Sequence, residues 1–167
     1  MSVRIPVVVL PVFALLAGCP QVDDQPTATE DPGVVIDADI VGSWLSTGDD
    51  VSALLIASSV TEVSATFEDD GTYTVVATDT NNGTTNFTGT YTVDTSTDPA
   101  SITISQESPY AATVEGIWAV DGTTMTYEII QTTPDLGFAP PTPASGFGTS
   151  TGTGLQPGDN TQVYQAQ

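Results

Sequence analysis

The chain has 167 residues, with 21 acidic side chains, one basic side chain and no histidine, which gives a formal net charge of −20. Nucleic-acid binding is excluded, because almost nothing in the chain could neutralise phosphates. With no histidine and one cysteine, the composition also gives no support to transition-metal sites or to serine-based nucleophilic catalysis.

The N-terminal segment has the layout of a secretory signal. Arg4 precedes an apolar run from Ile5 to Leu16, which is well short of the ~20 residues that a membrane-spanning helix needs. A Leu-Ala-Gly-Cys sequence then ends at Cys19, the only cysteine. This order resembles the signal of bacterial lipoproteins, which are cut before the cysteine and lipidated on it. The resemblance implies a signal peptide over residues 1–18 and lipidation at Cys19, and the alternative is an ordinary signal peptide with a chance cysteine.

The same resemblance bears on the location of the protein. Residue 20 is Pro20, whereas in enteric lipoproteins an aspartate at this position favours retention at the inner membrane. We therefore expect an exported protein that is lipid-anchored in the bacterial cell envelope, at the outer membrane rather than the inner one. The membrane is the expected partner, through the N-terminal lipid. Residues 19–38, rich in Pro, Gln, Asp and Thr, are predicted to be the lipidated cysteine and a flexible tether.

Residues 39–167 show the period-2 alternation of strands with one buried face. Val63, Ala65 and Phe67 alternate with polar residues, and Asp-Gly and Asn-Gly turns separate one such run from the next. Residues 51–56 are predicted to be a short helix or an irregular strand, and residues 132–159 a long loop rich in Gly and Pro. A last short strand over 161–167 places either Val163 or Tyr164 inward.

Four short motifs occur in order along this domain. They are Gly42-Ser43-Trp44, the stretch from Phe67 to Tyr73, the stretch from Gly89 to Val93, and the stretch from Gly116 to Tyr127. Their order and spacing resemble lipocalin-like families, and among them bacterial lipocalin-like lipoproteins. The resemblance implies an all-β fold, an antiparallel meander closing into a barrel of about eight strands, with Trp44 at the closed end. Lipocalins pack an arginine across that tryptophan, so here this closure is missing or replaced.

The inward-facing positions combine large and small side chains. The candidate cavity-lining residues are Trp44, Phe67, Tyr73, Phe87, Tyr91, Trp118 and Tyr127. The small inward residues, which would leave room at one end, are Ala65, Ala77, Gly89, Ala112 and Gly116. A barrel of eight strands can be filled by side chains or hold one small ligand. Two functions therefore stay open: binding of a small apolar ligand, or an envelope structural or protein-interaction module with a solid core and an unknown protein partner.

Adjacent carboxylates occur at two turns, Asp49-Asp50 and Asp69-Asp70. Neither pair has the spacing of a calcium-binding loop, so they are interpreted as solvated turn residues, with weak calcium binding left open. No catalytic residue, metal site or cofactor is predicted, and the chain is expected not to be an enzyme.

Replacement of the cysteine tests the anchor. In a bacterial host that processes lipoproteins, the Cys19→Ser variant should move from the membrane fraction to the soluble fraction, because no acyl chains can then be attached. Fractionation followed by immunoblotting measures this shift. A C19S variant that still sediments with membranes would contradict lipidation at this residue.

Overall fold

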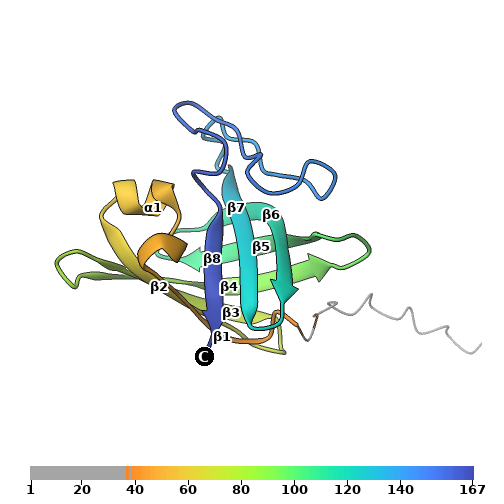
Figure 1. Ribbon diagram of the computed structural model, residues 1–167, viewed down its shortest axis with the longest axis horizontal. Coiled ribbons are helices and arrows are strands. Elements are labelled where there is room, and N and C mark those ends of the chain that lie inside the picture. The colour runs from red at the N-terminus through yellow and green to blue at the C-terminus, as the bar shows by residue number, and fades with distance from the viewer. Residues whose placement is uncertain (1–36, 38) are drawn as a thin grey trace, which may run out of the picture. The chain divides into compact units, whose positions relative to one another are not determined.

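A computed structural model describes Asp37 and residues 39–167, and it is a closed barrel of eight antiparallel strands (Figure 1). The strands are β1 (Gly42–Thr47), β2 (Val60–Phe67), β3 (Thr72–Asp79), β4 (Thr84–Asp94), β5 (Ala100–Ser108), β6 (Ala112–Asp121), β7 (Thr124–Thr133) and β8 (Gln162–Ala166). Each strand pairs with the next one along the chain, and β8 pairs with β1. The predicted all-β meander closing into a barrel is confirmed.

The predicted signal peptide, Cys19 and the tether up to residue 36 lie outside the described residues. In the part of the chain that the structure describes, no helix has the length and apolar character needed to cross a membrane.

Alternation along the strands determines which side chains enter the barrel. Val63, Ala65 and Phe67 are each at most 2% exposed, whereas the residues between them in β2 are half-buried. Threonine fills many outward positions, where its β-branched side chain suits a strand. The turns follow the sequence signals: Asn82, in the β3–β4 turn, has a φ of 59°, which asparagine tolerates better than most residues.

The C-terminal strand closes the barrel. Leu45 pairs with Gln165 across the β1–β8 seam, and the Gln167 amide donates to the Ser43 carbonyl at 2.9 Å. In β8 the buried residues are Gln162 and Tyr164, so of the two registers predicted for this strand the one with Tyr164 inward is correct. Closure gives every strand of the described domain two neighbours.

Two segments cover one end of the barrel (Figure 1). The short helix α1 (Ala53–Ala57) follows β1 through a 3₁₀ turn, η1 (Gly48–Asp50), so the helical alternative for this region is correct. The other segment is the long loop, residues 134–161. Strand β7 continues to Thr133, so it includes the first two residues of the predicted loop, 132 and 133.

Two of the small inward residues have a role other than leaving room. A Cβ on Gly116 would lie 2.0 Å from the Glu128 carbonyl oxygen, and a Cβ on Gly89 would lie 2.0 Å from the Ser105 carbonyl oxygen. Both glycines therefore let a neighbouring strand approach closely, as tightly curved sheets require. The space expected beside them is occupied by backbone.

The end of the barrel opposite α1 is filled with large side chains. Trp44, Phe67, Tyr91 and Trp118 are each at most 5% exposed, and the rings of Phe67 and Tyr91 meet edge to face with centroids 5.1 Å apart. The Trp44 indole donates to the Ile40 carbonyl at 2.9 Å. This end is therefore closed without the arginine that packs across the tryptophan in lipocalins.

Two tyrosines allow a matched test of this packing. The Tyr91 hydroxyl donates to the Glu68 carbonyl at 2.8 Å, whereas the buried Tyr127 hydroxyl has no hydrogen-bond partner among the described residues. Tyr91→Phe should lower the free energy of unfolding by about 1 kcal/mol, and Tyr127→Phe should leave it unchanged or raise it. Urea unfolding measures both, and equal destabilisation by the two variants would contradict this assignment.

Candidate ligand cavity

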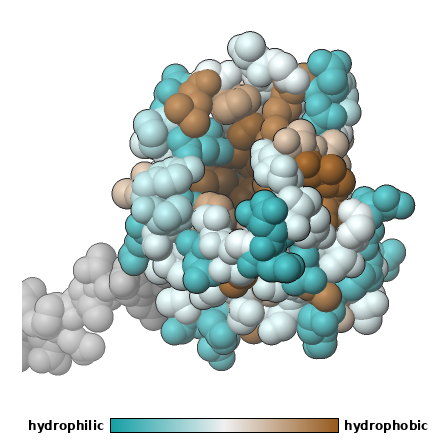
Figure 2. Space-filling model, turned by 90° about the vertical axis from the view of Figure 1, so that its left-hand side faces the viewer, coloured by the Kyte–Doolittle hydropathy of each residue, from teal (hydrophilic) through white to brown (hydrophobic). Residues whose placement is uncertain are grey.

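The barrel interior is hollow at the end that carries α1 and the long loop. A cavity of about 550 Å³ lies between Val75 and Ala77 of β3, Phe87 of β4, Ile104 of β5 and Ile129 of β7. Figure 2 shows this face of the molecule, with hydrophobic side chains gathered in and around a hollow. The cavity therefore occupies one half of the barrel, and the packed aromatic residues occupy the other.

The mouth of the cavity is framed by the helix and the long loop. The Leu54 amide of α1 donates to the Asp159 carbonyl of the loop at 2.9 Å, and the Ser52 amide approaches Gln162 Oε1 at 3.4 Å. These contacts hold the helix beside the start of β8. Leu54 and Leu55 then extend the apolar wall to the rim.

Apolar side chains are exposed around this mouth. Leu54 is 37% exposed, Ile56 51% and Tyr110 55%. Tyr110, whose position in the alternating pattern predicts an inward strand residue, instead lies in the turn before β6 and lines the cavity. The rim therefore carries exposed apolar side chains beside its polar ones.

The structure divides the seven candidate residues between the two ends of the barrel. Tyr73, Phe87 and Tyr127 line the cavity. Trp44, Phe67, Tyr91 and Trp118 belong to the packed core and do not line it. Phe67 connects the two groups, because its ring centroid lies 6.3 Å from that of Tyr73 and 6.2 Å from that of Tyr127.

Several lining residues have no counterpart among the predicted ones. They include Tyr164 on β8 and the side-chain amides of Gln106, Gln131, Asn160 and Gln162. Tyr164 could have been found, since one register of the last strand places it inward. The amides carried no signal, because polar residues near strand ends are ordinary at a surface.

The tyrosines of the cavity keep their protons. Burial, followed by the nearby Glu107 carboxylate, raises the pKa of Tyr73 to about 12. Burial, with the neighbouring Tyr164 and Tyr73 hydroxyls, raises the pKa of Tyr127 well above its ordinary value, and burial raises that of Tyr164 as well. These hydroxyls therefore stay neutral at physiological pH.

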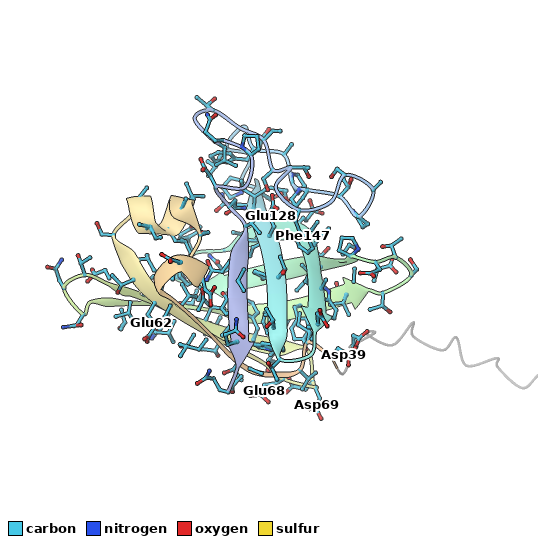
Figure 3. All side chains as sticks on the ribbon, viewed as in Figure 1. Asp39, Glu62, Glu68, Asp69, Glu128 and Phe147 are labelled. Carbon is cyan, nitrogen blue, oxygen red and sulfur yellow. The ribbon has the colours of Figure 1, made fainter. Side chains whose placement is uncertain are left out.

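A buried carboxylate holds the long loop on the outside of the barrel. Glu128 lies on β7 between two cavity-lining residues, so its side chain is on the outer face, and it is only 1% exposed. Its oxygens accept hydrogen bonds from the Gly148 amide, from the Ser150 amide at 2.8 Å and hydroxyl at 2.6 Å, and from the Thr161 hydroxyl at 3.0 Å. Figure 3 shows Glu128 and Phe147 at the end of the barrel that the loop covers.

These donors take the place of a positive partner. Burial opposes ionisation of Glu128, but the hydrogen bonds from Ser150, Gly148 and Thr161 outweigh it and hold its pKa below the ordinary value. Glu128 therefore attaches the long loop to β7 at two places: at Gly148 and Ser150, and at Thr161 just before β8. Sequence reasoning missed this residue, because it occupies an ordinary outward position.

The carboxylates of the described residues do not form a cluster suited to a metal ion. Within residues 39–167, no three His, Cys, Asp or Glu side chains come together as potential metal ligands. The predicted turn carboxylates accept local hydrogen bonds instead: Asp70 Oδ1 accepts from the Thr72 amide at 2.9 Å and the Thr72 hydroxyl at 2.7 Å.

Comparisons of the chain with protein-family models, with curated proteins and with solved structures found no match. The cavity is therefore the feature of this domain that bears most directly on function.

The loop attachment can be tested by replacing its central carboxylate. Glu128→Gln keeps the size of the side chain but presents an NH₂ group to one set of donors, so the free energy of unfolding at neutral pH should fall by about 2 kcal/mol. Because the pKa of Glu128 is lowered on folding, ionised Glu128 stabilises the protein above its ordinary pKa of 4.5 and loses this effect as the pH falls through the folded value.

The difference between wild type and E128Q should therefore shrink in acid. Urea unfolding across the pH range measures it. Glu62→Gln, on the exposed face of β2, is the matched control and should change stability little. An E128Q variant that behaves like E62Q would contradict the assigned role.

Proposed function

We propose that this chain is an exported, lipid-anchored lipoprotein whose lipocalin-like barrel binds a small apolar ligand. The observation that carries the proposal is the cavity of about 550 Å³ at one end of the barrel. Ligand cavities in proteins commonly have volumes of roughly 300–1,000 Å³ and largely apolar walls. The lipid anchor follows from the Cys19 signal alone and has its own test.

The cavity volume itself supports a binding role. Because the cavity opens to solvent through its mouth, its apolar wall faces water when no ligand is bound, and an apolar ligand would remove that wall from water. Val75, Phe87 and Ile129 in the wall offer water few hydrogen bonds. An apolar ligand is the occupant that such walls stabilise best.

The alternative function, an envelope structural or protein-interaction module, supposes a solid barrel core. The hollow end favours ligand binding over that alternative. Leu136, 60% exposed on the long loop, is a single exposed apolar side chain, which is ordinary on a protein surface.

A neutral fluorescent dye tests the proposal. N-phenylnaphthylamine should bind the described domain with enhanced fluorescence. Ala77→Phe places a ring inside the cavity and should weaken binding by about tenfold or more, a loss of ~1.4 kcal/mol, and Ala77→Leu should have a smaller effect. Thr74→Phe, on the exposed face of the same strand, is the matched control. Circular dichroism verifies that each variant is folded.

Two outcomes would contradict ligand binding in the cavity. One is the absence of dye binding by the folded wild-type domain. The other is equal dye binding by the wild-type protein and a folded A77F variant, which would place the dye outside the cavity.

A further inference from the structure

The polar groups at the cavity mouth are oriented by their own hydrogen bonds. The side-chain NH₂ groups of three lining residues donate to backbone carbonyls: Gln106 to Tyr110 at 2.9 Å, Gln131 to Pro134 at 3.0 Å, and Asn160 to Ile129. A backbone carbonyl only accepts, so each NH₂ group must face its partner. The side-chain carbonyl oxygen of each amide is then the polar atom that remains for other hydrogen bonds.

These three oxygens are free to accept a hydrogen bond. None of the three oxygens accepts a hydrogen bond from the described residues. They also do not belong to the buried polar atoms that lack a partner. Each oxygen is therefore accessible to solvent or to a ligand. Ser58 also lines the cavity, and its hydroxyl donates to the Leu54 carbonyl at 3.1 Å, so its oxygen is left as an acceptor. The accessible polar atoms of these four residues are therefore acceptors, whereas the unpartnered donors of the lining, Gln162 Nε2 and the Tyr127 hydroxyl, are buried.

The charges around the mouth have one sign. All the residues that line the cavity are uncharged, and the acidic residues Glu107 and Asp159 are next in the chain to the lining residues Gln106 and Asn160. The charge of Glu107 also contributes to the raised pKa of Tyr73 inside the cavity. No lysine, arginine or histidine occurs after Arg4, so nothing offsets this negative field.

We propose that the cavity selects amphiphiles whose head group donates hydrogen bonds and carries no negative charge, such as an alcohol or an ammonium group, and rejects carboxylates and phosphates. This inference rests on the proposed ligand binding and names the class of ligand.

The physical reason is the balance between hydration and replacement contacts. A carboxylate at this mouth would lose water, meet acceptor oxygens, and find no cation to compensate it. The neutral tyrosine hydroxyls can donate to it, but they lie in the negative field of Glu107. A hydroxyl or ammonium group can instead donate to the amide oxygens while its hydrocarbon chain occupies the apolar interior.

Three ligands with the same hydrocarbon chain separate these contributions. Decylammonium, decanol and decanoate are compared as displacers of N-phenylnaphthylamine from the described domain. Decylammonium and decanoate both carry one charge, so their comparison isolates its sign and the donor character of the head. The titrations are run in about 1 M NaCl, where the screening length is ~3 Å and long-range attraction to the acidic surface is suppressed.

Decanol and decylammonium should displace the dye. The concentration of decanoate needed for the same displacement should be at least about tenfold higher. A cation at the mouth should reverse this preference. Thr85→Lys, an exposed residue that lines the cavity, should strengthen decanoate binding and weaken decylammonium binding. Thr90→Lys adds the same charge on the outer face of the same strand and should leave both unchanged.

The outcomes distinguish this inference from the function on which it rests. Dye binding with equal displacement by decanoate and decylammonium overturns the selectivity and leaves ligand binding intact. Equal effects of T85K and T90K overturn the role of the mouth. Failure of the dye to bind overturns both the ligand-binding function and the selectivity.

Discussion

The absence of positive side chains after Arg4 is the constraint on which the rest of this structure depends. The carboxylates of the described residues have no lysine, arginine or histidine among those residues to pair with, and several of them accept hydrogen bonds from backbone amides and hydroxyls instead. Asp79 Oδ1 accepts from the amides of Asn81 at 2.7 Å and Gly83 at 2.9 Å, and Asp94 Oδ1 accepts from the Ser96 amide at 2.9 Å. Because these donors lie in turns, the acidic residues stabilise the connections between strands.

Stability in the body of the domain comes from closure and burial. The β1–β8 seam pairs every strand with two neighbours, so the backbone hydrogen bonds form a continuous ring. The aromatic residues around Phe67 fill one end, where apolar burial contributes roughly 25 cal/mol per Å² removed from water. That end supplies a rigid base, and the other end stays hollow without loss of the barrel.

The long loop and the cavity share strand β7. Glu128 on its outer face fixes the loop, while its neighbours Tyr127 and Ile129 line the interior. The loop in turn brings Asn160 and Asp159 to the mouth, where Asp159 is bonded to α1 through the Leu54 amide. A single buried carboxylate therefore contributes to the position of the elements that frame the ligand site, although it is on the opposite side of the sheet.

Sequence alone predicted the strands, their order and most of the residues that face inward. It did so because alternation and turn chemistry are local: Val63 to Phe67 reveal their buried face without reference to any other strand, and Asn82 marks its own turn. It also suggested Tyr73, Phe87 and Tyr127, which the structure places around the cavity.

Only the tertiary structure decided which half of the barrel is filled. Phe87, which lines the cavity, and Trp118, which belongs to the packed core, look alike in the alternating pattern. Their depth depends on the stagger between strands, which no single strand encodes. The same holds for Glu128, which is buried only because a distant loop folds over it, and for the amides of Gln106, Gln131 and Asn160, whose strand ends and loop converge at the mouth. Position along the barrel axis is a property of all eight strands together.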